Sequence, residues 1–87
     1  MNSNIKEISK IIKNLKSEDE ILEFLNEILT ESELHILSKR WHILKLLSQG
    51  QTQRQIAQNL NVSLCNVTRG AKILKENDAI VKKYLKG

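Results

Sequence analysis

Seven lysines and arginines lie in a stretch of the chain that contains no acidic residue. The stretch covers residues 34–75, and its basic members are Lys39, Arg40, Lys45, Arg54, Arg69, Lys72 and Lys75. Concentrated positive charge attracts anions, so the stretch predicts a polyanionic partner. A solvated basic helix face is the simpler alternative. It accounts poorly for 42 consecutive residues without a carboxylate, in a chain of net charge +4 whose first 30 residues are on balance acidic.

Residues 52–75 have the features of two short helices joined by a tight turn. Thr52 and Ser63 suit helix N-caps, Ala57 is small enough for a helix crossing, and Asn61 tolerates a positive φ. A shared core is expected from Ile56, Leu60, Val62, Val67 and Leu74. Such a unit is a helix-turn-helix, whose second helix enters the DNA major groove. The sequence therefore predicts that the polyanion is double-stranded DNA.

The side chains of this unit divide into two expected roles. Four are expected to hold phosphates, namely Gln53, Arg54, Lys72 and Lys75. Ser63, at the leading end of the second helix, is also expected to contact DNA. The four side chains near it are expected to face base edges or a thymine methyl: Leu64, Cys65, Asn66 and Thr68. An ordinary helical hairpin capped by Ser63 is the alternative. This alternative does not explain why polar and basic residues are concentrated on the second helix.

The chain as a whole is predicted to be all-α. It has no proline and only three glycines, and its apolar residues recur at three- and four-residue spacing. Helices are expected at about 5–15, 18–29, 31–49, 53–60, 64–75 and 78–85. Capping boxes are expected at Ser17 with Glu20, Thr30 with Glu33 and Thr52 with Gln55, and Gly50 suits the end of the third helix.

The expected helix at 31–49 is apolar around most of its circumference. One stripe is formed by Leu34, Leu37, Trp41, Leu44 and Leu47, and Ile36, Ile43 and Leu46 widen it. A surface helix needs cover on one side only, whereas this helix needs it on two. We therefore expect Trp41 in a core, and a second copy of the chain as the second cover.

Other function classes lack the residues that they need. The single cysteine, Cys65, excludes an internal disulfide, and with only His35 and His42 besides, a structural zinc site lacks ligands. No catalytic triad, carboxylate pair or glycine-rich phosphate loop is present, so we expect neither an enzyme nor a cofactor or metal. Short apolar runs and the absence of a signal-peptide pattern predict a cytoplasmic protein without membrane contact.

The basic segment resembles the bacterial tryptophan repressor family. The likeness covers about residues 25–75 and is carried by Leu29-Thr30, Arg40, Thr52-Gln53-Arg54, Val67-Thr68-Arg69-Gly70 and Leu74-Lys75. It implies a DNA-binding transcriptional repressor, a single domain over residues 1–87 and a six-helix chain that intertwines with a second copy as a homodimer. Its parts would be dimerisation helices at 1–50, the helix-turn-helix at 52–75 and a C-terminal dimerisation helix at 78–85.

The resemblance also implies L-tryptophan as corepressor, acting on genes of tryptophan metabolism. In the family, the indole ring lies between two arginines that match Arg40 and Arg69, and Gly70 leaves room beside the ring. The Thr30 position lies near the ligand's carboxylate, and carbonyls that match Glu27 and Leu29 of the other subunit take its ammonium.

Three positions depart from the family's pattern. Ile73 stands near the expected ligand site, at a position where the family usually has a small residue, often serine. Asn66 stands where threonine is usual. The connector at 50–52 is one residue shorter. Two alternatives therefore stay open. One is a ligand-independent DNA-binding regulator that has lost the pocket, and the other is a helical module that grips a protein partner with its long helix.

Overall fold

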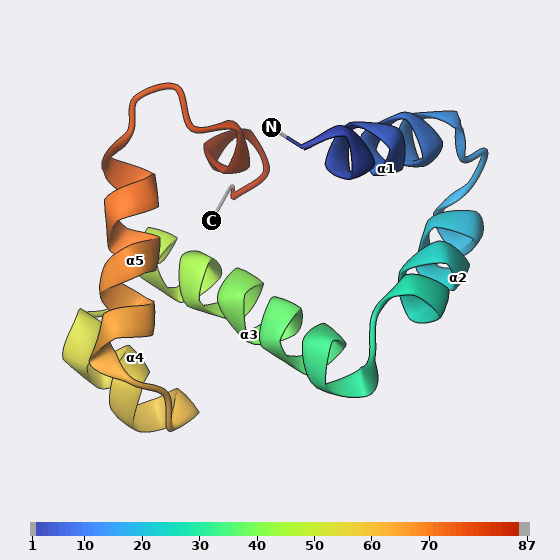
Figure 1. Cartoon of the computed structure of the whole chain (residues 1–87). Helices are drawn as coiled ribbons and strands as arrows, with labels where there is room; N and C mark the ends of the chain where they lie inside the picture. The colour runs from blue at the N-terminus through green and yellow to red at the C-terminus, as the bar shows by residue number, and fades with distance from the viewer. Residues whose placement is uncertain (1, 86–87) are drawn as a thin grey trace. The chain divides into compact units, whose positions relative to one another are not determined.

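A computed structural model describes residues 2–85, and this part of the chain is all-α, as predicted. The elements are α1 (Ser3–Asn14), α2 (Glu18–Ile28), α3 (Glu31–Ser48), α4 (Gln53–Leu60), α5 (Leu64–Lys75) and the 3-10 helix η1 (Ile80–Lys83) (Figure 1). The chain forms two compact units, one up to Leu34 and the other from His35 on. Among the described residues, no helix has the length and apolarity needed to cross a bilayer.

The helix starts of the first unit follow from side-chain caps. Thr30 and Glu33 form the predicted capping box, with the Glu33 N–H 3.1 Å from Thr30 Oγ1 and the Thr30 N–H 2.9 Å from Glu33 Oε1. Ser17 Oγ accepts from the N–H of Glu20 at 3.1 Å, but Glu20 Oε1 accepts from Lys16, at 2.8 Å. The second half of the predicted box at Ser17 is therefore wrong, because the extended backbone there leaves the Lys16 N–H within reach of the carboxylate.

The predicted bounds of α4 and α5 are confirmed, and local chemistry accounts for them. Gly50, with a φ of 92°, follows α3, and a complete capping box between Thr52 and Gln55 opens α4. Asn61 then takes the left-handed conformation, φ 53° and ψ 49°, and Ser63 caps α5. Residues 53–75 therefore form two helices joined by a short turn, as a helix-turn-helix requires.

The core of the second unit joins this helix pair to α3. Ile56 of α4 and Val67 of α5 are fully buried, and Ile43 of α3 is 3% exposed. Partly buried residues pack around them: Leu46, Leu47, Ala57, Leu60 and Val62. Figure 1 shows α4 and α5 side by side next to the end of α3. Leu74, predicted for this core, instead lines a hollow formed with Leu47, Ser48, Lys82 and Leu85.

Gly70 is buried where α5 packs against α3. A Cβ atom at this position would lie 3.2 Å from Ile43 Cγ2 and from Leu47 Cδ1. Such distances are tighter than ordinary van der Waals contact, so a larger residue would require the side chains of Ile43 and Leu47 to shift by a few tenths of an ångström. The glycine therefore allows α5 to pack closely against α3 at this point.

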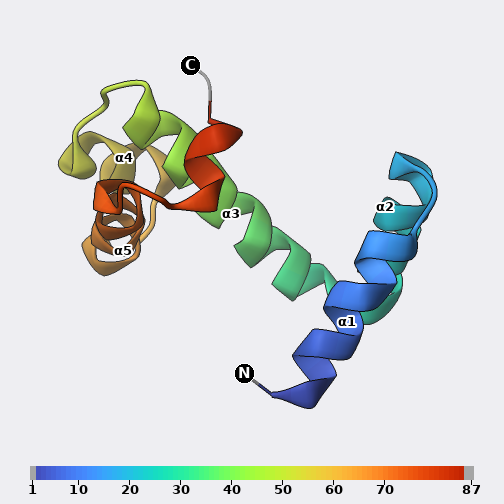
Figure 2. The same cartoon turned by 90° about the horizontal axis from the view of Figure 1, so that it is seen from above.

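The predicted helix at 78–85 is wrong, and with it the count of six α-helices in the described chain. Only the single 3-10 turn η1 forms, and Ala79 in front of it provides no side-chain cap. A helix this short fixes many backbone angles for few hydrogen bonds, so it is marginal without a cap or extensive packing. Figure 2 shows the segment, drawn in red, beside the C-terminal half of α3.

One side of α3 stays uncovered in the single chain. Ile43 and Leu44 are buried, whereas Ile36, Leu37 and Trp41 are 50%, 47% and 38% exposed. The prediction that Trp41 lies in a core is therefore wrong for one chain. The reason is that α4 and α5 pack only against the side of α3 that carries Ile43.

Asn61 offers a test of the turn. Replacing Asn61 with valine is expected to lower the free energy of unfolding by about 1–2 kcal/mol, because a β-branched residue is strained at positive φ, whereas Asn61→Gly should not destabilise. Urea unfolding followed by circular dichroism measures both changes. Asn59→Val, at an exposed position inside α4, is the matched control. An equal loss in the Asn59 and Asn61 valine variants would contradict this turn conformation.

Candidate functional site

A hollow of about 170 Å³ lies between α3 and α5, and we call it the slot. Its lining consists of Arg40, Ile43, Leu44, Asn66, Arg69, Gly70 and Ile73. Four of these residues, Arg40, Arg69, Gly70 and Ile73, were predicted to bind the ligand, and the structure brings them together. The four lining residues of α5 recur at three- and four-residue spacing, which places them on one face of the helix.

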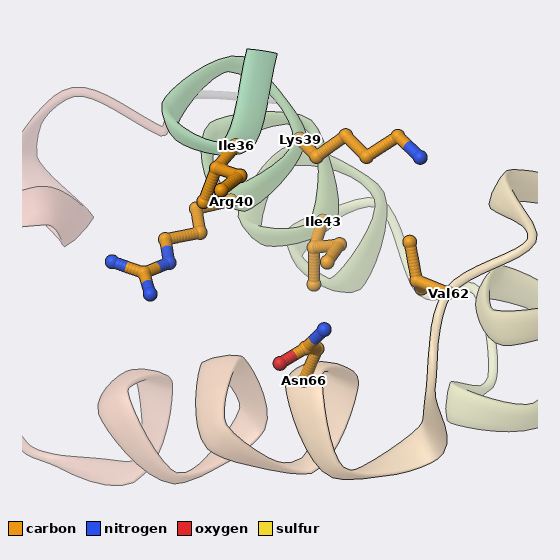
Figure 3. A pocket seen from close by; sticks show the side chains of 6 residues that line it. All are labelled: Ile36, Lys39, Arg40, Ile43, Val62 and Asn66. Carbon is orange, nitrogen blue, oxygen red and sulfur yellow. The ribbon is translucent and has the colours of Figure 1, made fainter. Parts of the chain in front are cut away.

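A second hollow of about 260 Å³ adjoins the slot. It is lined by Ile36, Lys39, Arg40, Ile43, Val62 and Asn66, three of which it shares with the slot. Figure 3 shows the Asn66 side chain rising from α5 toward Ile43, while the side chains of Lys39 and Arg40 extend to opposite sides. The two hollows combine apolar walls with cationic groups, which suits a partly apolar ligand that carries an acid group.

Asn66 lies on a different face from the one that the sequence suggested. It was expected to face DNA bases, but its side chain lines both hollows on the side of α5 that faces α3. The reason is its register, since Asn66 precedes Gly70 by four residues and Ile73 by seven. The structure therefore places Asn66 among the slot residues.

Another face of α5 carries four of the nine predicted DNA-contacting residues, Leu64, Cys65, Thr68 and Lys72. A shallow hollow of about 400 Å³, which we call the outer hollow, is lined by Leu64, Cys65, Thr68, Arg69 and Lys72. Its surface is almost wholly apolar. Arg69 lines both this hollow and the slot, so it lies between the two faces of the helix. One helix thus carries two candidate binding surfaces.

The start of α4 is joined to α5 by a side-chain hydrogen bond. Thr68 Oγ1 donates to Gln53 Oε1 at a distance of 2.9 Å. Arg54 follows Gln53 in the first turn of α4, and Lys75 ends α5, with both side chains exposed. Sequence reasoning missed the bond between Gln53 and Thr68, because their contact depends on how the two helices cross.

The three remaining ligand candidates belong to the first unit. Thr30 takes part in the capping box of α3, and Leu29 caps the C-terminus of α2 with its N–H donating to the Leu25 carbonyl. Glu27 lies in the last turn of α2, and its side chain is exposed. A role of these residues in ligand binding stays a prediction.

Several lining residues were not among the candidates from the sequence. They are Ile36, Lys39, Ile43, Leu44 and Val62. Ile36, Ile43 and Leu44 lie three or four residues from Arg40, so helical spacing alone could have found them, whereas Lys39 directly precedes Arg40. Cys65 is exposed. In the part of the chain that the structure describes, no three histidine, cysteine or acidic side chains gather as metal ligands would.

Comparison with known proteins identifies the family. The family described as Trp repressor protein matches residues 3–87. A Trp operon repressor homolog of Xylella fastidiosa is 37% identical over 78 residues, covering 88% of this chain and 83% of the relative. One of Chlamydia trachomatis serovar D is 32% identical over 76 residues, covering 86% and 81%. No solved structure matches significantly. With its helix-turn-helix and the slot beside it, the chain belongs to the Trp repressor protein family.

Proposed function

We propose that the protein is a sequence-specific, DNA-binding transcriptional repressor that acts as a homodimer and takes L-tryptophan as its corepressor. Membership of the Trp repressor family supports a DNA-binding regulator rather than an enzyme. One observation carries the proposal further. The helix α5 has the slot on one face and the outer hollow on the other, with Arg69 in both. A ligand in the slot would therefore act directly on the element that reads DNA.

The slot has the chemistry for an aromatic amino acid. The planar guanidinium groups of Arg40 and Arg69 can stack on an indole face, and one of them can also pair with a carboxylate. Ile43 and Leu44 offer apolar contact from the α3 side. L-Tryptophan combines an indole ring with a carboxylate. It therefore matches both kinds of lining group, and regulation of tryptophan-metabolism genes would follow from such a ligand.

The ligand would act by favouring one angle of α5 relative to α3. Gly70 holds the two helices in close contact, and the slot lies beside this contact. A ligand there stabilises the arrangement in which it fits best, and the DNA affinity rises if that arrangement also suits the duplex. Linkage then requires DNA to raise the ligand affinity by the same factor.

The positive charges at the ends of the helix pair support phosphate contacts. Lys75→Ala is expected to weaken binding to any duplex, and to reduce the slope of log K against log salt by about 0.9 for each phosphate that the variant no longer neutralises. Fluorescence anisotropy at several salt concentrations measures the slope. Lys16→Ala, far along the chain from the helix pair, should leave it unchanged. A slope that Lys75→Ala does not alter would remove this residue from the interface.

The uncovered side of α3 supports a homodimer. Ile36, Leu37 and Trp41 are exposed in a single chain, and a monomer of 87 residues buries only about 60–65% of the surface that its unfolded chain exposes. Sedimentation equilibrium is expected to give the mass of two chains. A monomer at micromolar concentration would instead favour the alternative function, a helical module that binds another protein through α3.

The alternative of a ligand-independent regulator rests on Ile73. This apolar side chain lines the slot, at the position where the family usually has a small residue. It takes up space and offers no hydroxyl group to the ligand's ammonium. The alternative keeps the DNA-binding helix pair and removes the corepressor.

One experiment separates these functions. A duplex selected from a random pool by the protein in the presence of L-tryptophan is titrated with protein, with and without the amino acid, at fixed salt. We expect the duplex affinity to rise by about 5- to 150-fold with L-tryptophan, the usual range of coupling between two sites. Equal affinities would favour the ligand-independent regulator. Failure to enrich any sequence would contradict sequence-specific DNA binding.

A further inference from the structure

We propose that the outer hollow of α5 receives the methyl groups of thymine, so that the protein reads its DNA site largely by apolar contact. This inference rests on the proposed DNA-binding function and specifies what that surface recognises. Its basis is the joint arrangement of Leu64, Cys65 and Thr68 around an almost wholly apolar hollow on the helix that follows the turn.

The outer hollow presents apolar side chains on an exposed face of α5. Leu64 is 52% exposed although it opens α5, and Cys65 beside it is exposed as well. Both side chains lie in the first turn, the part of a recognition helix that comes nearest to base edges. An apolar surface held in water gains free energy when it is covered by another apolar group. The hollow is therefore suited to an apolar feature of the ligand.

The hydrogen bond between Thr68 and Gln53 makes this face more apolar still. Because Thr68 Oγ1 donates its proton to Gln53 Oε1, at 2.9 Å, the hydroxyl has no proton left to donate to a base. Thr68 also carries a γ-methyl group, which is available for apolar contact. The same bond fixes the Gln53 amide and leaves its NH₂ group free to donate to a phosphate oxygen.

The charges around the hollow identify the occupant. Arg69 and Lys72 line it, and the surrounding residues 34–75 include no acidic side chain. An occupant that is apolar at its centre and negatively charged at its edges fits this pattern. In the major groove of DNA, the thymine methyl is the apolar group that base edges present, and phosphates flank it on both sides.

The test removes only the methyl groups. In a duplex selected on the wild-type protein, each thymine is replaced in turn by uracil, and the affinities are compared at fixed salt. We expect a loss of about fourfold for each contacted methyl group, since burying a group of this size is worth about 0.8 kcal/mol. Equal affinities for the thymine and uracil duplexes at every position, or a selected site without thymine, would overturn the inference.

Two variants of Thr68 separate its methyl from its hydroxyl group. Thr68→Val keeps the methyl, so the preference for thymine over uracil should persist, although the overall affinity falls because Gln53 loses its partner. Thr68→Ser keeps the hydroxyl, and we expect the preference to shrink by at least twofold. The opposite pattern would mean that the hydroxyl reads a base, and it would overturn the inference.

Leu64→Ala provides a further test of the thymine contact. We expect this variant to lose most of the preference for thymine, while Lys16→Ala, outside the helix pair, should keep it. An undiminished preference in Leu64→Ala would contradict the proposal. If the protein prefers no duplex sequence at all, the proposed DNA-binding function is wrong. If it binds a specific sequence but does not distinguish thymine from uracil, only the present inference is wrong.

Discussion

Replacement of Arg69 by alanine is expected to weaken L-tryptophan binding about 30-fold, which corresponds to about 2 kcal/mol. Arg69 lines the slot together with Arg40. A guanidinium that a bound indole ring covers, and that also pairs with the ligand's carboxylate, contributes energy of this size. Isothermal titration calorimetry measures the dissociation constant. The fold should persist, because the Arg69 side chain is exposed and lies outside the core of the second unit.

Two further variants show whether the effect comes from the slot. Arg54→Ala removes an arginine from the exposed start of α4, away from the slot, and should leave the affinity for L-tryptophan unchanged. Arg69→Lys keeps the charge but not the planar group, so we expect it to restore little of the affinity. If Arg69→Ala binds L-tryptophan as the wild type does, the ligand does not occupy this slot.

Replacement of Ile56 by alanine is expected to lower the free energy of unfolding by about 2–5 kcal/mol. Ile56 is fully buried and belongs to the cluster that joins α4 to Val67 of α5 and Ile43 of α3. Its removal leaves a cavity at the point where these three helices meet. Urea unfolding followed by circular dichroism measures the loss, and DNA binding should disappear under conditions in which the helix pair unfolds.

Leu64→Ala is the matched control for Ile56→Ala. It also shortens an aliphatic side chain of the helix pair, but Leu64 is 52% exposed, so the expected change is within about 0.5 kcal/mol. The contrast tests whether the core lies between α4, α5 and α3. Similar losses in the two variants would show that the apolar residues of this unit are buried differently.

The helix pair could be predicted from the sequence because its boundaries are set by local chemistry. The capping box at Thr52, the left-handed Asn61 and the cap at Ser63 each act within a few residues, so their effect does not depend on the rest of the fold. The same holds for Thr30 and the start of α3. For these elements the order of residue types was sufficient.

The C-terminal segment could not be predicted in this way. Ile80, Val81, Tyr84 and Leu85 have helical spacing, but the segment forms only the turn η1. It has no side-chain cap, and Ile80 and Tyr84 remain largely exposed in the single chain. Apolar spacing predicts a helix only where a neighbouring surface covers the apolar face.

The site residues that the family resemblance supplied could be predicted from the sequence. The residues whose direction depends on how the helices pack could not. Arg40, Arg69, Gly70 and Ile73 were named from the sequence and lie together in the slot. The direction of Asn66 depends on the rotation of α5 against α3, which single residues do not reveal. The bond between Thr68 and Gln53 links two helices across 15 positions of the chain, so it depends on their crossing.

The central claim is that ligand and DNA bind to two faces of the same helix and strengthen each other. The most direct measurement is a calorimetric titration of L-tryptophan into the protein alone and into its complex with the selected duplex. Our account predicts saturable binding to both, and tighter binding to the complex by the same factor, about 5- to 150-fold, by which L-tryptophan raises the duplex affinity. Equal dissociation constants, or no binding of L-tryptophan to either, would contradict it.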